Sequence, residues 1–284
     1  MKVPSTDGVE IAAHDLGGNG PRLLISHATG FHGRCYEPLA AALAGRRHSI
    51  AFDYRGHGDT PRPAGGVDWQ RYGDDAEAMA VWLFEQNGGE PIDAFGHSMG
   101  GACLLMAANR QPHLFRRLVL FEPIVFPPQG IRPDTPLEKV TESPMVAGAR
   151  RRRSTFHTFQ AAIDNYASKP PLNNFTPEAL RAYVLHGFAR DAHGVHLKCR
   201  PETEAETFEM GPHHDTYDRL PEILTDVLVV AGRVEEFQPS KIAREVADRL
   251  PNGRYLQLDE LDHFGPMVRP DLVADVITDA LSRS

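Results

Sequence analysis

The chain has 284 residues, of which 41% are hydrophobic, and its formal net charge is −8. This length and apolar content are sufficient for one large α/β domain with a full core. The acidic balance gives no basic footprint, so nucleic acid is not expected as a partner. The amino terminus does not resemble a signal peptide, and no window approaches the roughly 18 consecutive apolar residues of a membrane span. We therefore expect a cytoplasmic protein.

Short β-rich runs alternate with helical segments along most of the chain, which indicates a mostly parallel sheet with crossover helices on both faces. The expected strands are Val9 to His14, Arg22 to Ser26, His48 to Asp53, Ile92 to Phe95, Leu118 to Phe121, Val227 to Ala231 and Tyr255 to Leu258. The expected helices are Tyr36 to Ala44, Trp69 to Gln86, Met99 to Arg110, Lys241 to Leu250 and Asp271 to Leu281.

The alternation stops between Phe126 and about Leu220, where proline-rich turns and helical pieces such as Ser154 to Tyr166 and Pro177 to Phe188 take over. A structureless loop of this length is implausible inside a compact domain. The sequence therefore predicts a helical cap at 126–220, inserted into a core formed by 1–125 and 221–284. Its aromatic residues either line a pocket or form the cap's own core: Phe126, Phe156, Phe159, Tyr166, Phe175, Tyr183 and Phe188. The basic cluster Arg150 to Arg153 is expected to be a solvated helix face.

A candidate nucleophile lies where the strand ending at Phe95 meets the following helix. The sequence there is Gly96-His97-Ser98-Met99-Gly100, the pattern of a serine on a sharp strand-to-helix turn. The two glycines remove side chains where strand and helix pass close together, which allows Ser98 to sit at the tip of the turn. His97 is expected to point away from the nucleophile and to pack in the core.

A serine hydroxyl needs a base within hydrogen-bond reach. His263 follows the last expected strand, so it should lie at the same edge of the sheet as Ser98. The loop Ser26 to Phe31 follows an earlier strand at a place where a backbone amide can meet negative charge on a substrate oxygen. The amide of Met99 is the second expected donor of this oxyanion hole. His27 is expected to hold the loop by hydrogen bonds.

These pieces, in this order, resemble the α/β-hydrolase superfamily over nearly the whole chain. The resemblance implies that Thr29 supplies the first oxyanion amide, although Ala28 stands where many relatives have glycine. It also implies a structural role for the turn from Arg55 to Gly58. The matching residues are His27 to Gly30, Asp53 to Asp59, Gly96 to Gly101, and Asp262 with His263.

Two carboxylates compete for the third position of a catalytic triad, because relatives place the acid after either of two strands. Glu122 directly follows the apolar run Leu118 to Phe121, and Glu235 lies three residues beyond Gly232. A carboxylate at the end of a buried strand is costly unless it is paired. Glu235 is followed by Glu236 in a polar neighbourhood typical of a solvated loop. We therefore favour Glu122 and keep Glu235 as the alternative.

The sequence thus predicts a serine hydrolase that acts on a carboxylic ester or related acyl substrate through an acyl-enzyme on Ser98. Because position 98 is not aspartate, alkyl-halide and epoxide chemistry is disfavoured. Lactonase, thioesterase, carbon–carbon bond hydrolase and cofactor-free haloperoxidase activities remain alternatives on the same triad, and so does a non-catalytic ligand receptor.

No cofactor and no metal site are expected. The three cysteines lack zinc-site spacing, and the adjacent histidines of His213-His214-Asp215 rarely share one ion. The expected partner is a small-molecule acyl substrate, and the sequence leaves the formation of a homodimer open.

Overall fold

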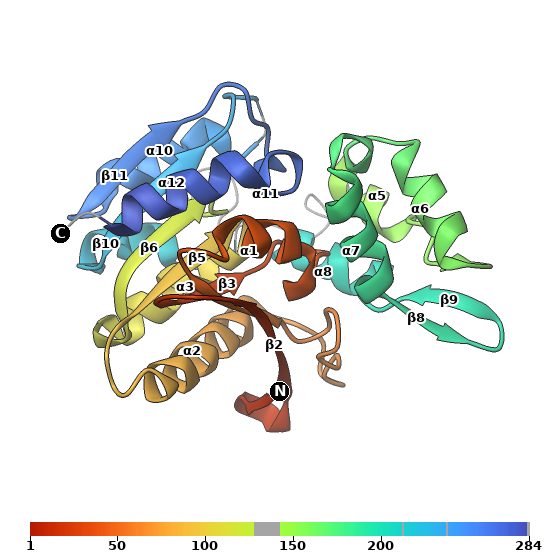
Figure 1. The fold of residues 1–284 in the computed structure, drawn as a ribbon, viewed down its shortest axis with the longest axis horizontal. Helices are drawn as coiled ribbons and strands as arrows, with labels where there is room; N and C mark the ends of the chain where they lie inside the picture. Colours follow the sequence, from red (N-terminus) through yellow and green to blue (C-terminus); the bar gives the residue numbers. More distant parts are fainter. Residues whose placement is uncertain (128–142, 212, 237, 283–284) are drawn as a thin grey trace.

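A computed structural model describes residues 1–127, 143–211, 213–236 and 238–282. Its largest element is an eight-stranded sheet with the order β1-β2-β4-β3-β5-β6-β10-β11 (Figure 1). Strands β3 to β6, β10 and β11 pair in parallel, whereas β2 pairs antiparallel with β1 and β4. The strands are β1 (Lys2–Pro4), β2 (Glu10–Gly18), β3 (Arg22–Ser26), β4 (His48–Asp53), β5 (Ile92–His97), β6 (Phe115–Phe121), β10 (Asp226–Ala231) and β11 (Gly253–Gln257).

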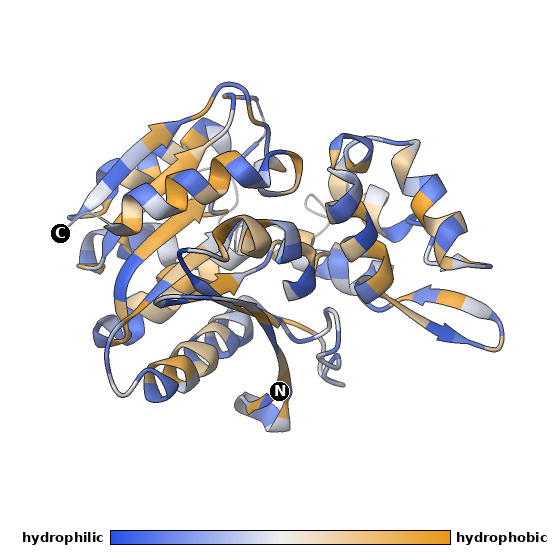
Figure 2. Cartoon of the chain, in the orientation of Figure 1, coloured by the Kyte–Doolittle hydropathy of each residue, from blue (hydrophilic) through white to orange (hydrophobic). Residues whose placement is uncertain are grey.

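Helices cover both faces of this sheet, which confirms the predicted fold class. One face packs against α2 (Trp69–Gln86), α3 (Met99–Arg110) and α10 (Ser240–Arg249). The other packs against α1 (Glu37–Leu43) and α12 (Pro270–Ser282), with the short α11 (Gly265–Val268) leading into α12. Figure 2 shows apolar residues concentrated on the central strands and mixed with polar ones along the helices. Strands buried on both faces read as continuous apolar runs, which is why the sequence revealed them.

The chain between β6 and β10 forms a layer beyond one end of the sheet (Figure 1). We call its described residues from 143 to 222 the inserted segment. It contains the helices α5 (Pro144–Arg150), α6 (Phe159–Ala167), α7 (Pro177–Gly187), α8 (Pro201–Met210) and α9 (Thr216–Arg219). It also contains a three-stranded antiparallel sheet of β7 (Thr155–Phe156), β9 (Gly194–Leu197) and β8 (Phe188–Asp191), which the sequence did not predict. Of the predicted cap, residues 128–142 and 212 lie outside the described residues.

Local capping sets where the helices of the inserted segment begin. The Thr158 hydroxyl accepts a hydrogen bond from the Ala161 amide at 3.1 Å, so α6 begins at Phe159. The expectation of a single helix from Ser154 to Tyr166 is therefore wrong at its start, because strand β7 occupies that stretch. Thr176 caps α7 in the same way, and Pro177 supplies its first turn.

Candidate active site

Ser98 lies on the turn between β5 and α3 in a strained conformation, with φ 56° and ψ −116°. A Cβ on Gly96 would lie 2.7 Å from the Gly101 Cα, and one on Gly100 would lie 2.3 Å from the Ser26 carbonyl oxygen. Only glycine fits at these close approaches. The backbone amide of Ser98 donates to the Phe121 carbonyl at 2.9 Å, which ties the turn to the end of β6. The predicted strand-to-helix turn is present.

His263 lies in the loop after β11, between Ser98 and Glu122. Its Nδ1 donates to the Glu122 Oε2 at 2.7 Å, and its Nε2 lies 3.2 Å from the Ser98 Oγ. A carboxylate only accepts, so this hydrogen bond places the proton on Nδ1 and leaves Nε2 free to accept from the serine hydroxyl. The structure therefore brings together three residues that the sequence singled out, in the order needed for proton transfer from serine to histidine.

Glu122 is fully buried at the end of β6 and has a left-handed backbone, with φ 46°. Its Oε1 accepts from the Gly232 amide at 2.9 Å while Oε2 faces His263. Both carboxylate oxygens are therefore hydrogen-bonded, which offsets the cost of burying the charge. The structure does not bring Glu235 into this group, because its side chain is 42% exposed and pairs with Arg233 at 2.9 Å.

In the described structure of the loop after β3, some backbone amides are hydrogen-bonded within the protein and others are left free to donate. The Ala28 amide donates to the Tyr36 hydroxyl at 3.2 Å, and His27 Nδ1 donates to the Ala28 carbonyl at 2.7 Å. Burial lowers the pKa of His27 to about 3, so its ring is neutral and serves as a hydrogen-bond bracket. Within the described ranges, the amides of Thr29 and Met99 have no hydrogen-bond partner.

A hydrogen-bond relay that the sequence did not predict connects this loop to His263. The Tyr36 hydroxyl, which accepts from Ala28, lies 2.8 Å from the His97 Nδ1, and the His97 Nε2 donates to the His263 carbonyl at 2.8 Å. Burial lowers the pKa of His97 well below its usual range, which keeps the ring neutral. His97 thus packs away from the nucleophile, as expected. Its hydrogen bond also fixes the backbone of His263.

A cavity of about 600 Å³ opens onto Ser98 and His263. It lies between the sheet edge and the inserted segment. Of the seven aromatic residues of the predicted cap, Phe126 and Tyr183 line it. Phe156, Tyr166 and Phe188 pack against one another as part of the segment's own core. Both roles expected from the sequence are therefore present, divided among different residues.

The remaining aromatic residues lie around this core. Phe175 stacks on Phe31, which itself lines the cavity, while Phe159 lies under the Arg190 guanidinium at 5.2 Å.

The arginine cluster is not a uniformly solvated helix face. Arg152 lies just beyond α5, and its side chain lines the cavity with 25% of its surface exposed. Its Nη2 pairs with the Glu204 Oε1 of α8 at 3.0 Å, and its Nη1 donates to the Tyr183 hydroxyl at 2.9 Å. The expectation for this residue was wrong because its partners lie far along the chain, where no local pattern points to them.

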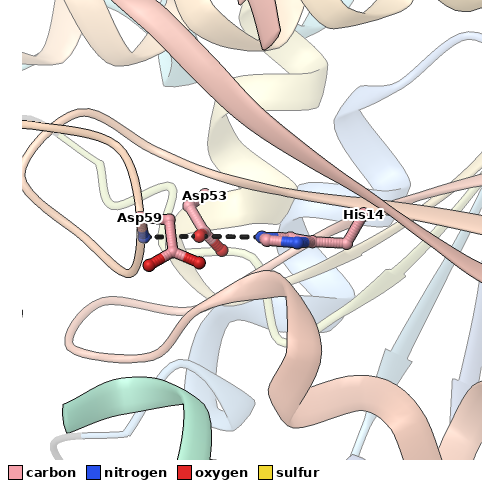
Figure 3. A group of neighbouring side chains, drawn as sticks. All are labelled: His14, Asp53 and Asp59. Carbon is pink, nitrogen blue, oxygen red and sulfur yellow. Dashed lines mark hydrogen bonds and ion pairs between the residues drawn. The ribbon is translucent and has the colours of Figure 1, made fainter. Parts of the chain in front are cut away.

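Side chains of metal-binding type meet elsewhere, at His14, Asp53 and Asp59 (Figure 3). The Asp53 carboxylate already accepts from the Gly33 amide at 2.7 Å, the Asp59 amide at 2.7 Å and the His14 Nε2 at 2.9 Å. Burial raises the pKa of Asp53, but the hydrogen bond and charge of His14, together with the nearby His32 and His27, outweigh it and hold the pKa well below its usual range. The Asp53 carboxylate at the centre of this cluster thus already has its hydrogen-bond donors within the protein.

The His213-His214-Asp215 stretch offers no ligand set in the described part of the chain. His214 Nε2 donates to the Ile124 carbonyl at 3.0 Å, and its Nδ1 lies 2.8 Å from the Thr216 hydroxyl. Both ring nitrogens of this partly buried histidine are therefore occupied by structural hydrogen bonds.

Residues 23–276 match the model of the Alpha/beta hydrolase family, and the chain belongs to this family. A curated relative, 2-(acetamidomethylene)succinate hydrolase of Mesorhizobium japonicum, is 25% identical over 92% of this chain and 88% of the relative. The putative non-heme bromoperoxidase BpoC of Mycobacterium tuberculosis is 27% identical over 92% of this chain and 94% of the relative. The putative carbamate hydrolase RutD of Agrobacterium fabrum is 27% identical over 89% of each chain.

Solved structures share the fold. The crystal structure of E-2-(acetamidomethylene)succinate hydrolase has a TM-score of 0.80 and 22% identity, covering 100% of this chain and 98% of that chain. The enol-lactonase from Burkholderia xenovorans has a TM-score of 0.69 and 21% identity, covering 100% of both chains. The protein is thus a hydrolase by family, with relatives of varied substrates. Among the helices described, none has the length and apolar character needed to cross a membrane.

Proposed function

We propose that this protein is a serine hydrolase that cleaves a carboxylic ester or related acyl bond through an acyl-enzyme on Ser98. The observation that carries the proposal is the hydrogen-bonded series from Ser98 through His263 to Glu122, which opens onto a cavity large enough for a small substrate. In this proposal the inserted segment is the cap of the site, and the cavity between the two parts holds the acyl group.

The proposed reaction has two steps. His263 Nε2 takes the proton of Ser98 as the hydroxyl oxygen attacks the substrate carbonyl, and Glu122 stabilises the imidazolium that forms. The amides of Thr29 and Met99 donate to the developing oxyanion, and each such donor is typically worth about 10²- to 10³-fold in kcat. His263 then protonates the leaving group and activates water against the acyl-enzyme.

The curated relatives support hydrolysis of an acyl bond, since two of them are named for hydrolysis of an acetamido compound and of a carbamate. The bromoperoxidase relative supports one alternative, in which the same three residues act as a cofactor-free haloperoxidase. Lactones, thioesters and carbon–carbon bonds are further alternatives, because fold and triad do not fix the substrate.

A fluorophosphonate probe tests the proposal. We expect stoichiometric labelling of the folded protein, with the label on the peptide that contains Ser98 and no labelling of Ser98→Ala. A wild-type protein that is folded but not labelled would overturn the proposal in favour of a non-catalytic receptor. Rates on p-nitrophenyl esters, lactones and thioesters, and peracid-dependent bromination, then rank the alternatives.

A further inference from the structure

The cavity next to Ser98 contains a charged pair that the proposed chemistry does not use. Arg152 and Glu204 both line it and meet at 3.0 Å between Nη2 and Oε1. The Glu204 side chain is 4% exposed, so its carboxylate is buried in the inserted segment's wall of the cavity. The Tyr183 hydroxyl accepts a hydrogen bond from the guanidinium Nη1 at 2.9 Å. The pair therefore has a fixed orientation.

This pair is not saturated by the protein. Among the residues that the structure describes, Glu204 Oε2 is buried and has no hydrogen-bond partner. Arg152 donates from Nη1 to the Tyr183 hydroxyl and contacts Glu204 through Nη2 as an ion pair, and a guanidinium carries further N–H donors. An unpartnered buried acceptor is unfavourable unless a bound molecule satisfies it. The pair thus retains hydrogen-bonding capacity directly behind the cavity surface.

Glu204 also lies close to the reacting centre. A Cβ on Gly30 would lie 2.5 Å from the Glu204 Oε1, and Gly30 directly follows Thr29, whose amide is a proposed oxyanion donor. Consecutive Cα atoms are about 3.8 Å apart. A substrate group that contacts the pair is therefore separated from the reacting carbonyl by only a few bonds.

We propose that Arg152 and Glu204 bind an uncharged, amide-like group on the acyl portion of the substrate, a few bonds from the carbonyl that Ser98 attacks. An amide presents both a carbonyl acceptor for the guanidinium and an N–H donor for Glu204 Oε2. A carboxylate on the substrate meets the negative Glu204 oxygen, and an alkyl chain leaves Glu204 Oε2 and the remaining guanidinium N–H groups without partners. This inference rests on the proposed function and specifies its substrate class.

Three p-nitrophenyl esters of similar acyl length test it, namely the N-acetylglycinate, the pentanoate and the hydrogen succinate. The first has an amide, the second an alkyl chain and the third a carboxylate. With uncatalysed rates subtracted, we expect kcat/KM for the N-acetylglycinate to exceed that of the other two by about 10-fold or more, as two net hydrogen bonds allow. A preference for the pentanoate or the hydrogen succinate would overturn the inference.

Glu204→Gln provides a sharper test. It removes the negative charge but keeps the size, which leaves Arg152 without a charged partner, so we expect selectivity to shift at least 10-fold toward the hydrogen succinate. The matched control is Glu206→Gln on the same helix, which pairs with Arg62 outside the cavity. It should keep the wild-type order of the three esters. An unchanged order in a folded Glu204→Gln, or the same shift in the control, would contradict the inference.

The outcomes separate this inference from the proposed function. If the fluorophosphonate labels Ser98 and all three esters are cleaved at similar rates, the function stands and the inference is wrong. If the probe does not label Ser98 and no ester is cleaved, both are wrong. Should Glu204→Gln fail to fold, the comparison of the three esters in the wild type still decides the inference.

Discussion

The sheet edge and the inserted segment both line the cavity, but their buried polar groups differ in how completely they are hydrogen-bonded. At the edge, Glu122 has both oxygens hydrogen-bonded, and His97 has both ring nitrogens occupied. In the segment, Glu204 Oε2 and the Tyr166 hydroxyl are buried without partners among the described residues, whereas among the described cavity-lining side chains of the edge only the Thr29 hydroxyl is. The edge is thus largely organised before any substrate arrives, as the proposed catalysis requires. The segment retains hydrogen-bonding capacity that a ligand can use.

The largest expected effect comes from breaking the organised edge at Glu122. Glu122→Gln should lower kcat/KM for a cleaved ester by about 10³- to 10⁴-fold, because an amide can neither stabilise the imidazolium nor enforce the Nδ1–H tautomer. Glu235→Gln is the matched control. Because the ion pair of Glu235 with Arg233 is exposed, its loss should change kcat/KM by about twofold or less. Initial rates at saturating and at limiting substrate concentrations provide kcat and kcat/KM. A large loss for Glu235→Gln instead would reassign the acid.

A stability measurement contrasts an ion pair inside the core with one that joins the core to the segment. Arg55 and Asp75 are both buried and pair at 2.7 Å, so Asp75→Asn should cost about 3–5 kcal/mol of unfolding free energy. The Arg62–Glu206 pair is partly exposed, and Glu206→Gln should cost about 1 kcal/mol or less. Urea denaturation measures both. Equal losses of unfolding free energy would show that the buried pair contributes no more to stability than the partly exposed one.

Acid should destabilise the core through its buried histidines. Burial lowers the pKa of His27 to about 3 and that of His57 to about 4, from 6.5. The unfolded chain takes up these protons first, so their stabilisation is present above pH 6.5 and is lost as pH falls toward the folded-state values. Each contributes a slope of up to about 1.4 kcal/mol per pH unit.

Denaturant midpoints between pH 7.5 and 4.5 check this expectation. His57→Asn should reduce the slope by about one proton, whereas His193→Asn, at an exposed position of the segment, should leave it unchanged. A pH-independent wild type would contradict the assignment of neutral, buried rings.

The smallest expected effect tests the relay between the loop after β3 and His263. Tyr36→Phe removes the hydroxyl that joins the Ala28 amide to His97, and should lower kcat about 5- to 10-fold with little change in KM. Tyr255→Phe is the control, since its hydroxyl contacts only Gln257 among the described residues. If kcat is unchanged in Tyr36→Phe, the relay does not position the site.

The features that the sequence predicted correctly are those with a local signal in the chain. The buried parallel strands read as apolar runs, and the Gly96 to Gly100 pattern located the turn at Ser98, because both signals are local. The pairing of Glu122 with His263 depends on strands far apart in the chain, so the sequence favoured this acid over Glu235 without deciding between them.

Tertiary contacts account for what the sequence did not predict. Arg152 looked solvated because its partner, Glu204, follows about fifty residues later. The strands β7 to β9 are two to four residues long, too short for a periodic pattern.

The place of Glu122 has a consequence for engineering. Its carboxylate accepts a hydrogen bond from the backbone amide of Gly232 after β10, and no side chain of residues 233–236 is hydrogen-bonded to it in the described structure. In the proposed mechanism the loop that follows supplies no charged group to the reaction, while Gln238 and Pro239 still border the cavity. Under the proposed function, new sequence grafted into this loop would change the cavity lining at these positions without replacing Ser98, His263 or Glu122.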